Sequence, residues 1–340
     1  MAEKTSAYAR AGVDIDAASR AKTLMKEAVH ATYGKEVLST VGSFGGMYAA
    51  NRLQEMADPV LVASTDGVGT KTMVAARVGR WDSIGQDIVN HCVNDILVQG
   101  AQPLFFLDYV ASSRLDPEQI AAVVRGIAAA CREAGCALLG GETAEMPGVY
   151  QPDELDLVGT IVGLVERRAI IDGSRIQPGD VVLGLPSSGL HTNGYTLART
   201  ALARLDWEEP LTELGASVGE ALLAPHRSYL PAVRALWQAG VDLRGLAHIT
   251  GGGLLDNPPR ILPDGTSMVL YRGSWETPPV FSLIQRHGGV SDQEMARVFN
   301  LGLGMLAVIP RADVEQAQHR LPEARLVGEI AAGGEVTLES

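Results

Sequence analysis

The sequence has little positive charge for its length. It carries 28 lysines and arginines against 40 acidic residues, which gives a formal net charge of -12. Nucleic acids and anionic membranes bind basic surfaces that displace counterions, so this balance argues against either as the main partner. A phosphorylated small molecule remains compatible, because backbone N–H groups and helix N-termini hold phosphate locally.

Cysteine and long apolar runs are also scarce. Cys92, Cys131 and Cys136 are odd in number and lie in apolar, helix-like stretches without zinc-ligand spacing. We therefore expect small buried hydrophobic side chains, not a disulfide or a metal site. No run approaches the roughly 18 apolar residues of a membrane span, and the start of the chain has no apolar stretch behind a basic one. These absences predict a cytoplasmic protein with no membrane partner.

A chain of 340 residues suits two domains, at roughly 100–200 residues each. Hydrophobic residues make up 46% of it, which is enough apolar surface for folded cores. Strand-like and helix-like segments alternate, and this order predicts an α/β protein. Turn-forming residues gather at 172–180, so we place the domains at 1–170 and 171–340.

Hydrophobic periodicity and capping residues predict the separate elements. Asp116, followed by Pro117 and Gln119, marks a helix start, and Gly135 marks its end. The other predicted helices cover 16–33, 83–99, 194–205, 226–239, 278–287 and 311–321. The predicted strands cover 59–63, 104–107, 137–139, 155–165, 181–185, 305–309 and 325–331.

Glycine is the one residue in excess, and its clusters adjoin acidic or hydroxyl residues. The stretch 64–71, Ser-Thr-Asp-Gly-Val-Gly-Thr-Lys, follows a predicted buried strand, so we interpret it as an active-site loop for phosphorylated ligands. It is not a P-loop, because threonine and not glycine precedes Lys71. Residues 302–307 match a dinucleotide fingerprint in letters, but they precede a strand, and we discount the match.

Carboxylates stand among these glycines or at element ends, at Asp66, Asp95, Glu142 and Glu145. Mg²⁺ takes hard oxygen ligands, usually one or two carboxylates besides water and phosphate, and glycine amides can approach the phosphates. The pattern therefore favours a magnesium-phosphate site. For Asp66 the alternative is a plain turn, since Asp-Gly is a common turn dipeptide.

The predicted helix at 83–99 carries one polar stripe beside an apolar one. The simplest interpretation is an amphipathic helix with a solvated face. Such a face usually holds Lys, Arg and Glu, whereas this stripe holds only short groups that bind metal or hydrogen-bond a ligand. We therefore favour a ligand-binding role for it. The stripe consists of Asp87, Asn90, His91, Asn94 and Asp95.

The second half has two further glycine-rich turns. Residues 187–195 lie between a predicted strand and helix, where hydroxyls and amides suit a phosphate. His191 within them can act as a general acid or base, or as a plain hydrogen-bonding residue. Residues 250–253, Thr-Gly-Gly-Gly after His248, suit close approach of backbone to ligand, or form a flexible connection.

These motifs resemble the AIR synthetase family, the phosphoribosylformylglycinamidine cyclo-ligases of purine biosynthesis. The resemblance covers nearly the whole chain and departs from the family at Asn90 and His91. It implies a two-domain α/β fold, each domain a mixed sheet covered by helices, and a homodimer whose N-terminal sheets pair. The matching motifs are Tyr8 with 11–16, then 65–71, 92–95, 99–101, 105–109, 140–148, 187–195 and 248–253.

The resemblance also implies the reaction, which is ATP-dependent closure of formylglycinamidine ribonucleotide to aminoimidazole ribonucleotide, with Mg²⁺ and ATP as cofactors. In this family ATP phosphorylates the formyl-amide oxygen, a nitrogen attacks the activated carbon, and phosphate leaves. The implied magnesium ligands are Asp66, Asp95 and Glu142, and the implied catalytic residues are Asp95, His191 and Lys71. The implied ATP and phosphate contacts are Asp66, Gly67, Gly69, Thr70, Lys71, Asn94, Gly140, Gly141, Ser187, Ser188, Gly189, Asn193, Gly251 and Gly252.

Other ATP-dependent members of the superfamily remain alternatives, among them thiamine-monophosphate kinase, selenophosphate synthetase and the hydrogenase maturation dehydratase. The early glycine loop lacks the cysteine of many selenophosphate synthetases, and residues 336–340 lack the terminal cysteine of the maturation protein. A non-catalytic nucleotide-binding protein is the alternative from a different class. Intact acidic and glycine motifs argue against it.

Overall fold

The computed structural model describes residues 14–339, which form two compact units. The first unit holds the chain up to Cys92 together with 102–166, and the second holds 93–101 and the chain from Arg167 onward. The change of unit after Glu166 lies four residues before the boundary that we placed at 170. The grouping of 93–101 with the second unit was not expected. Asn94 and Asp95 in this segment contact residues of the second unit, as described below.

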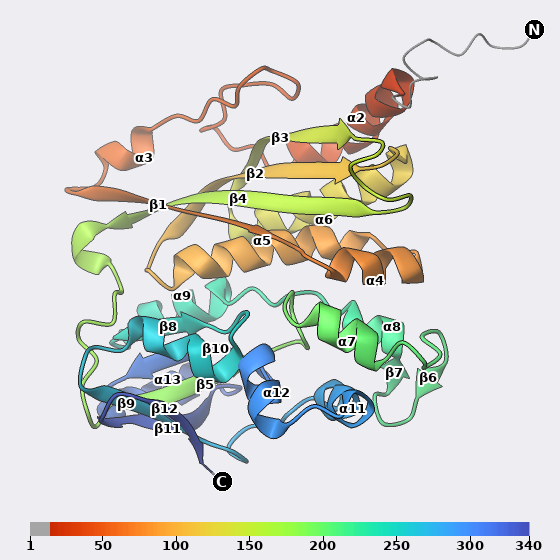
Figure 1. Ribbon diagram of the computed structural model, residues 1–340. Helices are drawn as coiled ribbons and strands as arrows, with labels where there is room; N and C mark the ends of the chain where they lie inside the picture. Colours follow the sequence, from red (N-terminus) through yellow and green to blue (C-terminus); the bar gives the residue numbers. More distant parts are fainter. Residues whose placement is uncertain (1–13, 340) are drawn as a thin grey trace, which may run out of the picture. The chain divides into compact units, whose positions relative to one another are not determined.

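The first unit is built on a four-stranded mixed sheet in the order β1-β4-β2-β3 (Figure 1). Strands β1 (Pro59–Gly67) and β2 (Gln102–Ser112) both run antiparallel to β4 (Leu155–Glu166). Strand β3 (Ala137–Glu145) runs parallel to β2, and helix α6 (Pro117–Ala134) supplies the crossover that a parallel pair requires.

Helices α5 and α6 lie on one face of this sheet (Figure 1) and approach each other at two glycines. A side chain on Gly85 would come within 2.1 Å of the Val123 carbonyl oxygen, and one on Gly126 within 2.1 Å of the Asp82 carbonyl oxygen. Glycine at both positions therefore permits the close helix contact. The other helices of this unit are α2 (Ile15–His30), α3 (Asn51–Gln54), α4 (Lys71–Val78) and α5 (Asp82–Leu97), whose last turn belongs to the second unit.

The opposite face of the same sheet is exposed along β1. Alternate residues of a strand point to the same face, and on this face of β1 Leu61, Ala63 and Thr65 are exposed. Leu61 is 57% exposed. Ala63 and Thr65 pair with Val162 and Thr160 of β4, which are themselves half-buried. This face is therefore largely apolar and partly open to solvent.

The second unit is built on a six-stranded mixed sheet in the order β12-β9-β11-β5-β10-β8, with β9 and β12 as its parallel pair. Every residue of strand β10, which lies between β5 and β8, is buried. The strands are β5 (Val181–Pro186), β8 (Gly245–His248), β9 (Thr266–Tyr271), β10 (Leu303–Ile309), β11 (Arg325–Ala332) and β12 (Val336–Glu339), with a separate ribbon of β6 (Pro210–Leu211) and β7 (Ala216–Ser217).

Helices of the second unit bury their apolar faces in its core, as Val233 and Leu236 of α9 and Phe281 and Ile284 of α11 show. The α-helices are α7 (Tyr195–Ala201), α8 (Val218–Leu222), α9 (Leu230–Gln238), α10 (Gly253–Asp256), α11 (Pro279–Gly288), α12 (Asp292–Val298) and α13 (Val314–Arg320). The 3-10 helices are η1 (Arg167–Ala169), η2 (Pro258–Ile261) and η3 (Arg311–Asp313).

Two mixed sheets with helices confirm the predicted α/β class. All three cysteines are buried thiols, as predicted. Residues 303–309 form strand β10, which confirms that the nearby fingerprint does not open a helix. Two predicted loops were wrong in extent. Strand β1 continues to Gly67 and α4 begins at Lys71, while β3 continues through 140–145.

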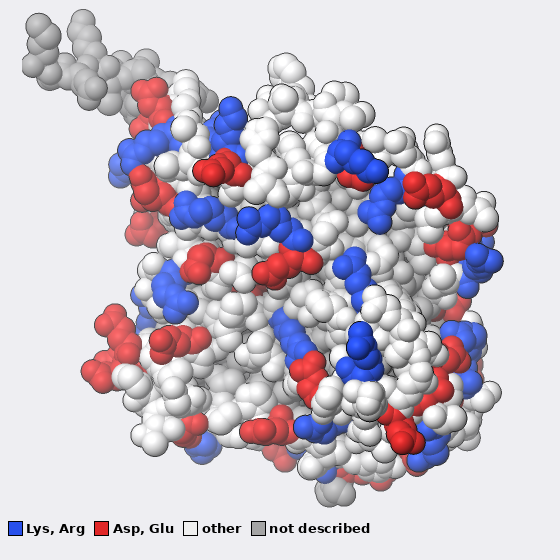
Figure 2. Space-filling view, turned by 180° about the vertical axis from the view of Figure 1, so that it is seen from behind, with Lys and Arg blue, Asp and Glu red and all other residues white. Residues whose placement is uncertain are grey.

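No helix between residues 14 and 339 is long and apolar enough to cross a membrane. On the face drawn in Figure 2, basic side chains are interspersed with acidic ones. That view shows no continuous basic area on the described part of the chain.

Candidate active site

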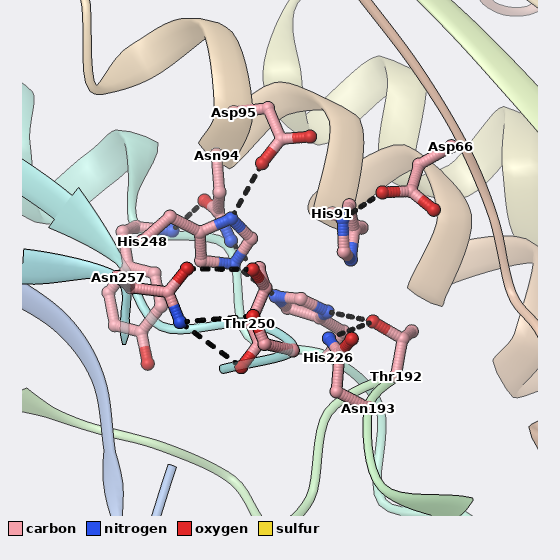
Figure 3. Close-up of polar contacts among 12 residues, drawn as sticks. Asp66, His91, Asn94, Asp95, Thr192, Asn193, His226, His248, Thr250 and Asn257 are labelled. Carbon is pink, nitrogen blue, oxygen red and sulfur yellow. Dashed lines mark hydrogen bonds and ion pairs between the residues drawn. The ribbon is translucent and has the colours of Figure 1, made fainter. Parts of the chain in front are cut away.

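Asp66 lies near the end of β1, beside the side chain of His91 on α5 (Figure 3). Asp66 Oδ2 lies 2.8 Å from His91 Nε2, and Asp66 Oδ1 accepts a hydrogen bond from the N–H of Gly67 at 2.6 Å. The His91 side chain is 4% exposed, whereas that of Asp66 is 45% exposed. A carboxylate fixed by two donors and still open to solvent is well placed to receive a cation.

Lys71 begins α4 and forms a buried ion pair. Its Nζ lies 2.8 Å from Asp87 Oδ2 of α5, and neither side chain is accessible to solvent. Burial lowers the pKa of Lys71, and the charge of Asp87 acts in the opposite direction. Removal of one partner from such a pair leaves an uncompensated buried charge, which costs about 3–5 kcal/mol. The pair therefore ties the turn after β1 to α5, and Lys71 does not present its ammonium group at the surface.

Glu142 lies on β3, at the edge of the sheet opposite to β1. Asp66 pairs with Gly159 of β4. Gly159 pairs with Asp108 of β2, and Asp108 pairs with Gly141 of β3. Three strand spacings of about 4.8 Å separate the ends of this row. Magnesium–oxygen distances are about 2.1 Å. Within one chain, the sheet therefore holds Asp66 and Glu142 too far apart to bind a single ion. These are two of the three predicted magnesium ligands.

Asp108 is a carboxylate that the sequence analysis did not single out for a role. Burial raises the pKa of Asp108 to about 7, and the charge of Glu142 acts in the same direction. Its Oδ1 lies 2.2 Å from the point where a β-carbon on Gly141 would stand. Gly141 thus makes room for this carboxyl group.

In the second unit, buried histidines join the end of α5 in one polar network (Figure 3). His248 Nδ1 lies 2.9 Å from Asp95 Oδ1, and His248 Nε2 lies 3.1 Å from His226 Nε2. The ring of His191 stacks on that of His226, with centroids 4.0 Å apart and planes inclined by 18°. The three histidines are at most 7% exposed, and the Asp95 side chain is 25% exposed. Asp95 is thus the member of this network that can meet a ligand.

The three histidines raise the question of a metal site, because one ring nitrogen of each lies within 4.8 Å of the others. The lone pair of an imidazole nitrogen lies in the ring plane. The nearly parallel planes of His191 and His226 do not let both lone pairs converge on an ion about 2.0–2.1 Å away, as Zn²⁺ requires. The network is therefore arranged for hydrogen bonding.

Asn94 fixes this network to the backbone of the segment before α9. Its Oδ1 accepts a hydrogen bond from the N–H of Tyr229 at 2.9 Å, and its Nδ2 donates to the carbonyl oxygen of Arg227 at 2.9 Å. Nδ2 also lies 3.2 Å from His226 Nε2. Asn94 is completely buried. Its side chain therefore serves the protein interior, where the sequence predicted a phosphate contact.

The glycine turn at 250–253 lies beside the other predicted phosphate turn, because a side chain on Gly251 would come within 3.2 Å of Asn193 Oδ1. Asn257, which is 2% exposed, holds the turn in shape. Its Nδ2 donates to the carbonyl oxygen of Gly253 at 2.9 Å, and its Oδ1 accepts from Thr250 Oγ1 at 3.2 Å. Nothing in its sequence surroundings distinguishes Asn257 from an ordinary loop residue.

The turn that begins at Ser187 is held by a second buried asparagine, Asn300. Ser187 Oγ donates to Asn300 Oδ1 at 3.0 Å, and Asn300 Nδ2 donates to the carbonyl oxygen of Gly189 at 2.8 Å. The N–H of Ser188 lies 3.3 Å from His191 Nε2. His191 has a φ of +63°, a conformation that few residues other than glycine adopt and that concentrates at functional sites.

Comparison with known proteins bears on both units. Residues 49–165 match the family model described as AIR synthase related protein, N-terminal domain, and residues 177–340 match the corresponding C-terminal domain. A phosphoribosylformylglycinamidine cyclo-ligase of Desulfitobacterium hafniense is 51% identical over 332 residues, which are 96% of this chain and 97% of that protein. One of Gloeobacter violaceus is 52% identical over 314 residues, covering 91% and 92%.

Solved structures show the same fold at low identity. The E. coli hydrogenase maturation protein HypE has a TM-score of 0.66 at 18% identity and covers 93% of this chain and 92% of its own. Thiamine-monophosphate kinase from Stenotrophomonas maltophilia K279a has a TM-score of 0.66 at 18% identity, covering 93% and 95%. These two likenesses concern the fold alone. The two domain matches and the full-length relatives show that the chain belongs to the AIR synthase-related family, together with the phosphoribosylformylglycinamidine cyclo-ligases.

Proposed function

We propose that the protein converts formylglycinamidine ribonucleotide to aminoimidazole ribonucleotide, with hydrolysis of ATP to ADP and phosphate. The observation that carries this proposal is 51% identity, over 96% of the chain, to a protein named for that ring closure. The glycine and acidic motifs of both units support it. Thiamine-monophosphate kinase is a structural neighbour at only 18% identity, so it supports the rival activity less well.

The chemistry explains the need for ATP. An amide oxygen is a poor leaving group, whereas phosphate is a good one. Phosphoryl transfer to the formyl oxygen therefore allows a nitrogen of the substrate to attack the formyl carbon, form the C–N bond and expel phosphate as the C–O bond breaks. The attacking nitrogen loses a proton. The protein contributes mainly by positioning the reactants and by neutralising charge.

The carboxylates suit magnesium, which supplies charge neutralisation at phosphate oxygens when bound. Asp66 and Asp95 are each held by a histidine and keep 45% and 25% of their side chains exposed. We assign both to magnesium. Glu142, at the far edge of the sheet, is assigned to a separate cation position. An Asp95→Asn variant that folds and keeps full ATP turnover would refute its assignment.

The remaining roles divide between direct contact and support. His191, with its constrained backbone, assists proton movement or orients the substrate. Lys71 and Asn94 are buried, and we propose that they support the site from within. The groups proposed to contact ATP or substrate phosphates are Gly67, Gly69, Thr70, Gly140, Gly141, Ser187, Ser188, Gly189, Asn193, Gly251 and Gly252.

We also propose a homodimer that covers the open face of the first unit's sheet. Leu61 and Ala63 are exposed there, and Val162 is half-buried beside them. Contiguous exposed apolar surface of this kind marks protein contacts. A second copy of the chain offers the same face, so the contact can be self-complementary.

The proposed reaction is tested by ADP release from purified protein with Mg-ATP and one candidate substrate at a time. We expect turnover with formylglycinamidine ribonucleotide and none with thiamine monophosphate. The Asp95→Asn variant serves as the control for a contaminating ATPase. Turnover with thiamine monophosphate, or none with formylglycinamidine ribonucleotide, would overturn the proposal.

A further inference from the structure

Asn94 anchors one end of the buried histidine network. Its Oδ1 accepts from the N–H of Tyr229, and one hydrogen of its Nδ2 is donated to the carbonyl oxygen of Arg227. These two contacts fix which end of the amide is oxygen and which is nitrogen. A side-chain amide nitrogen has two hydrogens, and the second faces His226 Nε2 at 3.2 Å. Asn94 thus contacts the His226 ring at Nε2.

The two ring nitrogens of His226 contact different partners. Its Nδ1 lies 3.4 Å from Thr192 Oγ1. Its Nε2 lies 3.1 Å from His248 Nε2. A hydrogen bond between these two nitrogens joins the two rings. The position of the His248 ring is thereby fixed.

The other nitrogen of His248 reaches Asp95. Its Nδ1 lies 2.9 Å from Asp95 Oδ1, so the ring that His226 holds also sets the orientation of the carboxylate. Asn94 and Asp95 are consecutive on α5, which means that the contacts run from α5 through His226 and His248 and return to the next residue of the same helix. Such a closed chain restrains every member more than a single contact does.

We infer that His226 is a positioning residue that sets the magnesium affinity of the site through His248 and Asp95. This inference rests on the proposed magnesium role of Asp95. Groups that orient a metal ligand typically change metal affinity or activity by about 10–100-fold when they are replaced. His226 itself is 1% exposed and makes no contact with substrate or metal in this account.

The test replaces His226 in the full-length protein with glutamine or asparagine, whose amide groups lie at different distances from the backbone. The terminal group of glutamine reaches the place of His226 Nε2, whereas that of asparagine reaches only the place of Nδ1. His226→Gln therefore keeps a hydrogen-bond partner for His248. His226→Asn removes that partner, although its side chain carries the same amide group. His319→Gln, on the exposed side of α13, is the neutral control.

Two quantities are measured: the Mg²⁺ concentration for half-maximal ATP turnover, and Mn²⁺ binding by electron paramagnetic resonance with a non-hydrolysable ATP analogue. We expect both to weaken about 10-fold or more in His226→Asn and to return to within about threefold of wild type in His226→Gln. Equal metal dependence in wild type and His226→Asn overturns the inference, as does an equal loss in both variants. Failure of the proposed reaction differs from these outcomes, because wild type would then bind Mn²⁺ without turning over formylglycinamidine ribonucleotide.

Discussion

Asp108 lies on β2 of the first unit, where burial raises the pKa of its carboxyl group to about 7. An aspartate in an unfolded chain titrates near pH 3.9. Between about pH 4 and pH 7 the folded chain therefore binds more protons at this position than the unfolded chain does. The free energy of unfolding therefore decreases as pH rises through this window, and the decrease is complete above about pH 7.

Asp108→Asn keeps the shape of the side chain but cannot ionise. We expect the variant to gain thermal stability over wild type at pH 8, with a difference that shrinks towards zero near pH 4. Thermal unfolding followed by circular dichroism at four values between pH 4 and pH 8 measures this difference. Asp264→Asn, at an exposed turn, is the matched control. A stability difference that does not vary with pH contradicts the assignment.

The sequence allowed the site residues to be picked out by their chemical type, but it did not reveal how buried each one is. The stripe on α5 was assigned to ligand binding because its side chains are short and polar, and Asp87, Asn90, His91 and Asn94 are indeed buried, which excludes a solvated face. Burial also separates their roles in a way that spacing does not. His226 was missed because a single histidine at the start of a predicted helix carries no signal, and its partner Asn94 is 132 residues away.

At the scale of elements, the ends of a helix were predicted correctly where the residues at those ends determine them. Helix α6 starts where Asp116 accepts hydrogen bonds from the next turn and ends at Gly135, which has a φ of +73°. Strand β3 was predicted too short, because its glycines have low strand propensity but pair with β2 through the backbone. Partners remote in sequence supply that pairing, so no local pattern reveals it.

The close contact between α5 and α6 makes a second prediction. Gly126→Ala adds about 1 kcal/mol of helix propensity. It also places a β-carbon 2.1 Å from the backbone oxygen of Asp82, a clash that no side-chain rotation relieves. Overpacking of this kind costs about 1–3 kcal/mol or more. We expect the clash to prevail and the variant to be less stable by up to roughly 2 kcal/mol, as the net of these two terms.

Chemical denaturation with urea measures the effect of Gly126→Ala. Gly45→Ala is the control, because a β-carbon at Gly45 meets nothing within 4 Å. Because α5 also carries Asp95, the Gly126 variant should lose activity together with stability. A variant as stable as wild type would show that the two helices are not held at this distance.

At the scale of the whole molecule, the exposed face of the first sheet predicts the oligomeric state. A charge at Leu61, which is 57% exposed, costs little in the isolated chain but is unfavourable once a second apolar surface covers it. We expect Leu61→Asp to shift the protein from dimer to monomer in size-exclusion chromatography with light scattering. Leu326→Asp, at a site 41% exposed in the second unit, should leave the dimer intact. A wild-type monomer, or a dimeric Leu61→Asp variant, contradicts the proposed interface.

Domain organisation was predicted only in outline, because 93–101 belongs to the second unit although both flanking segments belong to the first. A boundary drawn from turn residues assumes continuous domains. The contacts of Asn94 with Arg227 and Tyr229 override that assumption.

The central claim is that ATP activates the formyl oxygen of the substrate. Its most direct test is the fate of that oxygen: formylglycinamidine ribonucleotide labelled with oxygen-18 at the formyl carbonyl is converted in unlabelled water, and the released phosphate is analysed by mass spectrometry. The account predicts one labelled oxygen in each phosphate released. Unlabelled phosphate, with the oxygen-18 in water or retained in the nucleotide product, would contradict it.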